Sequence, residues 1–248
     1  GVKEDLESRK LSRAQILEAV EKAAAVRADI SNFQNNSLSL IAEVKRSSPS
    51  KGALAPISDP ALLASKYEKG GASAISVLTE RRRFGGSLED LDAVRKAVDL
   101  PILRKDFMVD EYQFYEARAH GADVVLLIVA ALSKNQLEDF FHLAKELGMR
   151  SLIEVHTHDE LERALEISPE IIGVNSRNLK TLDVDAQAFA ELIPQIPSTI
   201  ARVAESGIST RQEVAFAQEC GATAILVGEA LVRSGSPLVA IDQLLGRL

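Results

Sequence analysis

Short apolar runs alternate along the chain with longer segments of helical pattern. The apolar runs, which are typical of buried strands, lie at residues 38–44, 73–78, 101–104, 122–129, 151–155, 171–175, 200–205 and 223–228. Segments with apolar residues at helical spacing follow them at 60–69, 88–98, 111–120, 134–147, 158–166, 185–192, 210–219 and 236–247. Many of these segments begin at a capping residue or end at glycine, as helices usually do. The pattern therefore predicts eight strand–helix units.

The region before the first strand has a different pattern. Residues 4–30 place Leu6, Ile16, Leu17 and Val20 at roughly helical spacing among many charges, which predicts an amphipathic helix. Residues 32–37 are polar and predict a linker. We expect a single domain over residues 1–248, with an N-terminal helical extension at 1–36 and the strand–helix units at 37–248.

Eight strand–helix units predict an α/β protein with the (β/α)8 TIM-barrel fold, and 248 residues suit one such barrel. The alternative is a doubly wound open sheet. Such a sheet usually carries a Gly-x-Gly-x-x-Gly turn after its first strand, and the chain has no such motif there.

Composition and charge limit the kinds of partner and the cell compartment that we expect. The net charge of −7 argues against nucleic acid or an anionic membrane as the main partner. Cys220 is the only cysteine, so no intrachain disulfide can form, which suits a reducing cytoplasm. The apolar run from Val124 to Leu132 is too short to cross a bilayer. With no secretion signal evident, we expect a cytoplasmic protein without a membrane partner.

Charged side chains occur where the predicted strands end, which is where barrel enzymes build their active sites. Glu43 and Lys45 share one face of the first strand with Ile41, because strand side chains alternate. Burying an unpaired charge is costly, so this pair indicates function, although an ion pair made for stability is the alternative. Comparable strand-end positions hold Lys105, Glu154, Asn175, Arg177, Glu205 and Ser206. We expect an acid–base set in which the two lysines lower each other's pKa values.

The last two strands end at Gly207 and at Gly228–Glu229. Loops at these places in barrels bind phosphate through backbone N–H groups. We favour a phosphate site over the alternative, in which both glycines are ordinary turn residues.

Several motifs closely resemble the indole-3-glycerol phosphate synthase family. They are Glu-Val-Lys-Arg-Ser-Ser-Pro-Ser-Lys-Gly, Ile-Ser-Val-Leu-Thr-Glu followed by Phe-Gly-Gly-Ser, Leu-Arg-Lys-Asp-Phe, Leu-Ile-Glu-Val, Val-Asn-Ser-Arg-Asn-Leu, Glu-Ser-Gly-Ile and Val-Gly-Glu-Ala-Leu. They keep the family's order and strand positions from about residue 38 to about residue 233. The resemblance implies a cofactor-free lyase of tryptophan biosynthesis. Its reaction would close the indole ring of 1-(o-carboxyphenylamino)-1-deoxyribulose 5-phosphate, with loss of carbon dioxide and water.

The resemblance also implies residue roles. Lys105 would act as general acid on the substrate carbonyl, Glu154 would handle a proton during dehydration, and Glu43 with Lys45 would assist dehydration and hold the substrate carboxylate. Phosphate would bind at Gly207, Gly228 and Glu229, and neither a metal nor a cofactor is implied. The remaining substrate-binding positions are Ser48, Asn175, Arg177, Glu205 and Ser206, with Pro49, Phe84, Phe107, Leu126, Leu179 and Leu226 as the apolar lining around the aromatic ring.

The expected partner is a small phosphorylated substrate. We expect a monomer, and contact with other tryptophan-pathway enzymes stays open. One alternative is a phosphoribosylanthranilate isomerase, which typically uses Cys and Asp where this chain offers Glu and Lys. Another is a non-catalytic phosphometabolite-binding barrel, which would have lost at least one of these charges.

Three further segments contain charged residues or histidines with expectations of their own. Arg81–Arg83 either steers an anionic substrate or is a solvated loop. His156 and His158 lack a third ligand in sequence, so we expect a turn and a helix start there. Residues 47–60 form a long loop, which we expect to be a mobile lid with Lys51 reaching into the site.

Overall fold

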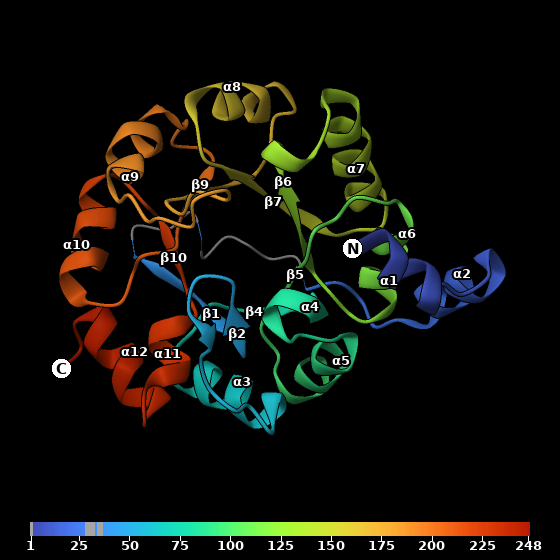
Figure 1. Ribbon diagram of the computed structural model, residues 1–248, viewed down its shortest axis with the longest axis horizontal. Helices are drawn as coiled ribbons and strands as arrows, with labels where there is room; N and C mark the ends of the chain where they lie inside the picture. The colour runs from blue at the N-terminus through green and yellow to red at the C-terminus, as the bar shows by residue number, and fades with distance from the viewer. Residues whose placement is uncertain (1, 28–32, 34–36) are drawn as a thin grey trace.

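A closed barrel of eight parallel strands forms the centre of the molecule (Figure 1). The computed structural model describes residues 2–27, 33 and 37–248. The barrel strands are β1 (Ser39–Val44), β4 (Ala74–Leu78), β5 (Ile102–Lys105), β6 (Val124–Ile128), β7 (Arg150–Val155), β8 (Ile171–Asn175), β9 (Ala201–Glu205) and β10 (Ala224–Val227). They pair in chain order, and β1 closes the barrel by pairing with β10. The predicted TIM barrel is confirmed.

A ring of helices surrounds the strands (Figure 1). It contains α3 (Pro60–Lys69), α5 (Leu88–Ala97), α6 (Tyr112–Ala119), α7 (Lys134–Glu146), α8 (His158–Glu166), α9 (Gln187–Leu192), α10 (Arg211–Glu219) and α12 (Pro237–Leu245). The side chains of Asp59, Ser133 and Thr210 accept backbone N–H groups in the first turns of α3, α7 and α10 and so cap these helices. None of the described helices combines the length and apolar character that crossing a bilayer requires.

The sequence pattern did not predict several short elements in the connections. They are the small hairpin of β2 (Ser47–Ser48) and β3 (Gly52–Ala53), the helices α4 (Arg81–Phe84) and α11 (Glu229–Arg233), and the 3-10 turns η2 (Val129–Ala131) and η3 (Ile193–Gln195). Elements of two to five residues are shorter than the window over which periodicity is detectable. The hairpin and α4 order two loops that the sequence left without structure.

Side chains of each strand alternate between two apolar layers. On β1, Ile41 joins the cluster inside the barrel, whereas Leu40, Ala42 and Val44 join the cluster between strands and helices. This is the division predicted for the first strand. It directs Glu43, which lies on the same face as Ile41, into the interior.

The N-terminal region differs from its prediction. The single helix expected over 4–30 is two helices, α1 (Val2–Arg9) and α2 (Arg13–Lys22), because Ser12 forms a capping box with Gln15. The last residues expected in that helix, 28–30, and most of the expected linker lie outside the described residues. Phe33 is described and is buried in the interior cluster, so the linker is not polar throughout. Both helices lie outside the ring beside α6 (Figure 1). There Leu6 of α1 and Ile16 of α2 are buried in one cluster with Tyr112 of α6.

Candidate active site

A cavity of about 840 Å³ opens at the carboxyl ends of the strands, and every strand of the barrel contributes to its wall. The wall contains all the site residues expected from the sequence: Glu43, Lys45, Ser48, Pro49, Phe84, Lys105, Phe107, Leu126, Glu154, Asn175, Arg177, Leu179, Glu205, Ser206, Gly207, Leu226, Gly228 and Glu229. The fold therefore brings these residues to one place, although they are scattered along the chain.

An ammonium group lies between two buried carboxylates at the bottom of this site. Lys105 Nζ on β5 donates to Glu154 Oε2 on β7 at 3.1 Å and to Glu205 Oε2 on β9 at 2.9 Å. Both carboxylate side chains are 2% exposed and that of Lys105 is 14% exposed. A positive charge held this way can deliver a proton to a substrate oxygen.

The charge balance around Lys105 corrects one prediction. Burial by itself would lower the pKa of Lys105, but the carboxylates of Glu154, Glu205 and Glu43 outweigh burial and raise it. The expectation that the two lysines of this rim lower each other's pKa values is therefore wrong for Lys105. Three buried carboxylates dominate the potential at its ammonium group.

The two carboxylates that hold Lys105 have pKa values displaced in opposite directions. Burial raises the pKa of both, but Lys105 and then His156 bring that of Glu154 below its ordinary value. For Glu205, burial and the neighbouring Glu154 outweigh Lys105 and raise the pKa to about 7. Glu205 Oε1 has no hydrogen-bond partner among the described residues, which leaves its charge poorly compensated. Two nearby acids separated in this way provide an ionised group and a protonated group at one pH.

A second ion pair lies at the end of β1. Lys45 Nζ is 3.4 Å from Glu43 Oε1, and Ser76 Oγ donates to Glu43 Oε2 at 3.2 Å. Gly228 passes close by, since a Cβ at that position would be 2.6 Å from Glu43 Oε1. Gly228 is therefore needed to make room for Glu43 and is not an exchangeable turn residue.

Two aromatic rings and two cations form one side of the cavity. The rings of Phe84 and Phe107 have centroids 6.5 Å apart. Lys45 Nζ lies 5.6 Å from the centroid of Phe84, and the guanidinium carbon of Arg83 lies 5.9 Å from that of Phe107. Apolar ring surface beside positive charge suits a flat aromatic group that carries a carboxylate.

The connections after β8, β9 and β10 supply turns and cations. Ser206 and Gly207 both have left-handed φ angles, 69° and 70°. This conformation strains serine and suits glycine, and such strain is often found at functional sites. Lys180 and Arg233 from these connections line the cavity, as does Lys51 from the β2–β3 hairpin. Lys51 was expected to reach in, whereas the other two carry no sequence signal that separates them from surface cations.

A buried arginine next to Lys105 was missed. Arg104 is 0% exposed and points away from the barrel interior, toward α6. Its guanidinium donates to Thr79 Oγ1, Asp106 Oδ2, Glu116 Oε2 and the Gln113 carbonyl at 2.8–3.1 Å. These contacts hold the backbone on both sides of Lys105. The alternation of faces along β5 was the only sequence signal, since it places Arg104 opposite Lys105.

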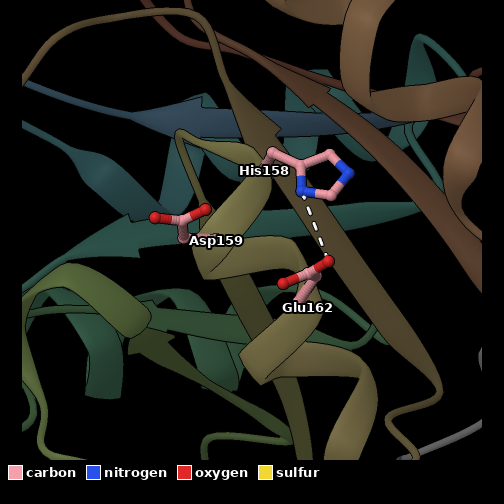
Figure 2. A group of neighbouring side chains, drawn as sticks. All are labelled: His158, Asp159 and Glu162. Atoms are coloured by element: carbon pink, nitrogen blue, oxygen red, sulfur yellow. Dashed lines mark ion pairs between the residues drawn. The ribbon is translucent and has the colours of Figure 1, made fainter.

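The structure separates the two histidines that follow β7. His158 Nδ1 pairs with Glu162 at 3.6 Å on the exposed side of α8, with Asp159 beside them (Figure 2). The ligand atoms of the three lie within 4.8 Å of one another, but all are exposed and form an ordinary first turn, so we assign no metal to them. His156 was expected to be a turn residue. Its Nε2 instead lies 3.4 Å from Oε1 of Glu154, so it contacts a residue of the site.

A parallel barrel with paired charges at the carboxyl ends of its strands defines a (β/α)8-barrel enzyme. Solved structures with this fold include 3-hexulose-6-phosphate synthase, with a TM-score of 0.67 and 16% identity over 85% of this chain and 100% of that chain. Another is the N-acetylmannosamine-6-phosphate 2-epimerase from Clostridium perfringens, with a TM-score of 0.65 and 16% identity over 92% and 100% of the two chains. At this identity they show the fold alone.

Sequence comparison is more specific. The family described as indole-3-glycerol phosphate synthase matches residues 2–244. The indole-3-glycerol phosphate synthase of Micrococcus luteus is 54% identical, over 97% of this chain and 92% of the relative. That of Paenarthrobacter aurescens is 56% identical, over 98% and 92%. The chain belongs to the indole-3-glycerol phosphate synthase family.

Proposed function

We propose that the protein converts 1-(o-carboxyphenylamino)-1-deoxyribulose 5-phosphate to indole-3-glycerol phosphate, a carboxy-lyase reaction of tryptophan biosynthesis. The observation that carries the proposal is Lys105, held between Glu154 and Glu205 in a cavity with an aromatic side. The names of the relatives support the same reaction.

The first half of the reaction closes the ring. The ring carbon that bears the carboxylate attacks the ketone carbon, and Lys105 donates a proton to the ketone oxygen as negative charge develops on it. Carbon dioxide then leaves from the same ring carbon, and its bonding electrons restore the aromatic ring. Phe84 and Phe107 hold the ring while Lys45 lies near its carboxylate.

The second half removes water. The hydroxyl formed at the former ketone carbon leaves with a proton that Lys45, paired with Glu43, supplies. Glu154, ionised beside Lys105, accepts the proton lost from the neighbouring methylene carbon. The residues thus supply one acid to protonate the ketone oxygen, a second acid to protonate the departing hydroxyl, and one base. The proposed chemistry requires no cofactor.

The rest of the cavity wall binds the polar tail of the substrate. Backbone N–H groups at Gly207, Gly228 and Glu229 would bind the phosphate, with Arg233 in the same wall. Asn175, Arg177 and Ser206 would bind the hydroxyls of this tail, and Ser48 with Pro49 would close the site from the β2–β3 hairpin.

We also propose that residues 1–248 act as one domain, and that the protein works as a monomer in the cytoplasm. Its partner in this proposal is the phosphorylated substrate, with neither nucleic acid nor membrane involved. Sedimentation of the purified protein, alone and with other tryptophan-pathway enzymes, tests the oligomeric part.

The deciding experiment follows indole formation by ultraviolet absorbance. The wild-type protein should form product, and Lys105→Met, which keeps the side-chain volume and removes the charge, should lower kcat by about 10²–10⁴-fold. Lys134→Met, at a lysine 68% exposed on α7, is the matched control and should keep wild-type kcat. Absence of product from the wild type would reject the proposal, and conversion of phosphoribosylanthranilate would favour the isomerase alternative.

A further inference from the structure

His156 lies directly after β7, with its ring between two carboxylates. Its Nε2 is 3.4 Å from Glu154 Oε1, and its Nδ1 is 3.2 Å from Glu160 Oε2 in the first turn of α8. The same Glu160 oxygen accepts the backbone N–H of His156 at 2.7 Å. The His156 side chain is 11% exposed, so its position is determined by these neighbours more than by water.

Only one protonation state suits this arrangement. A neutral imidazole has one N–H and one lone pair, so one nitrogen would turn its lone pair toward a carboxylate. An imidazolium places N–H groups toward both carboxylates. Nε2 has no hydrogen-bond partner in the part of the chain that the structure describes, so Glu154 is the group available to compensate it.

The surrounding charges favour the same state. Burial would lower the pKa of His156, but Glu160 and Glu154 outweigh it, with Glu205 on β9 adding to the effect, and raise it. The ammonium group of Lys105, which shares Glu154 with His156, is engaged by Glu154 and Glu205. The η2 turn, which contacts both β7 and α8, carries only Val129, Ala130 and Ala131.

We propose that His156 is a positioning residue for Glu154. As an imidazolium anchored on Glu160, it holds Glu154 Oε1 and keeps Glu154 ionised, while Oε2 of the same carboxylate stays with Lys105. This inference rests on the proposed function, in which Glu154 moves a proton. In addition, His156, which is not part of the cavity wall, would set the pH range in which Glu154 is ionised and can accept a proton.

The chain offers a matched control two residues away. His158 pairs with Glu162 in the same i,i+4 arrangement (Figure 2), but these side chains are 54% and 68% exposed and neither lines the cavity. A change at His158 therefore tests the loss of a histidine–glutamate pair on α8 without touching Glu154.

The experiment compares His156→Gln, His156→Leu and His158→Gln. The glutamine amide nitrogen can reach the position of the histidine Nε2 and donate to Glu154, but it carries no charge. Purified variants are assayed for kcat and KM across pH. The pKa of His156 is measured by NMR in the wild type and in Glu160→Gln.

We expect His156→Leu to lower kcat by about 10–100-fold with little change in KM, because a charge-assisted contact to Glu154 is lost. The limb of the kcat profile that reports Glu154 should move to higher pH in both His156 variants, since removing a positive charge raises the pKa of a neighbouring acid. His156→Gln should recover most of the lost kcat, and His158→Gln should match the wild type. The pKa of His156 should lie above its ordinary value of about 6.5 in the wild type. It should be lower in Glu160→Gln than in the wild type.

Two results would overturn the inference. One is a kcat profile in which the His156 variants show no displaced limb, whether or not kcat itself falls, since that is the signature of a packing role. The other is an NMR titration in which His156 is already neutral at pH 6. Should His156→Leu fail to fold, His156→Gln and the Glu160→Gln titration still decide the matter. A wild-type protein without product would reject the proposed function instead, while the NMR result would stand by itself.

Discussion

Gly173 on β8 leaves the space that the carboxylate of Glu205 on β9 occupies. A Cβ added at Gly173 would lie 2.0 Å from Glu205 Oε1. The two residues are on adjacent strands, and Glu205 is 1% exposed, so the carboxylate has little freedom to withdraw. A glycine inside the barrel thus allows Glu205 to reach Lys105.

Gly173→Ala should therefore displace Glu205 and weaken its contact with Lys105. Overpacking of a dense interior costs about 1–3 kcal/mol, so the free energy of unfolding should fall by this amount, and kcat should fall with it. Denaturant titration and the indole assay measure the two effects. Gly235→Ala is the control, because nothing lies within 4 Å of a Cβ there, and it should change neither quantity. Full kcat in Gly173→Ala would show that Glu205 tolerates displacement.

The raised pKa of Glu205 predicts a pH-dependent effect on stability. Its pKa is about 7 in the folded protein against an ordinary value of 4.5, so the folded state binds more protons between these values. Stability contributed by this group is therefore present below pH 4.5 and is lost as pH rises to 7. In Glu205→Gln this loss is absent. Relative to the wild type, the variant should gain about 3 kcal/mol in unfolding free energy across this range.

Glu154→Gln should show the opposite trend. The pKa of Glu154 is lowered, so its contribution to stability is present above the ordinary pKa of the unfolded chain and is lost as pH falls through the lower, folded value. Urea titrations of both variants and the wild type from about pH 2.5 to pH 8 provide the comparison, because the contribution of Glu154 changes only below its ordinary pKa of 4.5. Parallel curves for the two variants would contradict the assignment of opposite pKa displacements.

Arg104 and Glu116 connect the backbone beside Lys105 to the N-terminal helix. Glu116 Oε2 accepts from Arg104 at 2.8 Å, and Glu116 Oε1 accepts from Arg9 of α1 at 2.8 Å. Glu116→Gln should lower the unfolding free energy by about 3–5 kcal/mol, because it leaves the buried Arg104 charge poorly paired. Glu166→Gln, which breaks the exposed Lys134–Glu166 pair, is the control and should have little effect. Equal losses in the two variants would show that the buried hydrogen bonds of Arg104 stabilise the fold no more than an exposed ion pair does.

Arg82 and Arg83 should have different effects, although they are adjacent. Arg83 lines the cavity near Phe107, whereas Arg82 faces Glu4 and Asp5 of α1. Arg83→Glu should lower kcat/KM for the anionic substrate several-fold, and more strongly at low salt, because charge steering is screened by ions. Arg82→Glu should leave kcat/KM near the wild-type value. Measurements at two salt concentrations separate the outcomes, and equal losses in the two variants would favour general steering by the whole run of arginines.

The local pattern of apolar and polar residues was sufficient to predict the fold. The order of strands and helices, the inward face of β1 and the location of Lys105 at a strand end all follow from periodicity and from the alternation of side chains. The same local rules failed where an element was too short, as in α4, or where one capping residue divided a helix, as at Ser12.

The partners of each charge depended on the tertiary structure. Lys105 contacts acids 49 and 100 residues away, and neither distance is visible in a local pattern. A pKa is set by burial and by all nearby charges in space, which is why the direction for Lys105 was predicted wrongly and the contact of His156 with Glu154 was missed. The amino-acid sequence by itself determined which side chains reach the carboxyl ends of the strands. Barrel closure decided which of them meet, because only closure brings distant strand ends within the few ångströms over which hydrogen bonds and buried charges act.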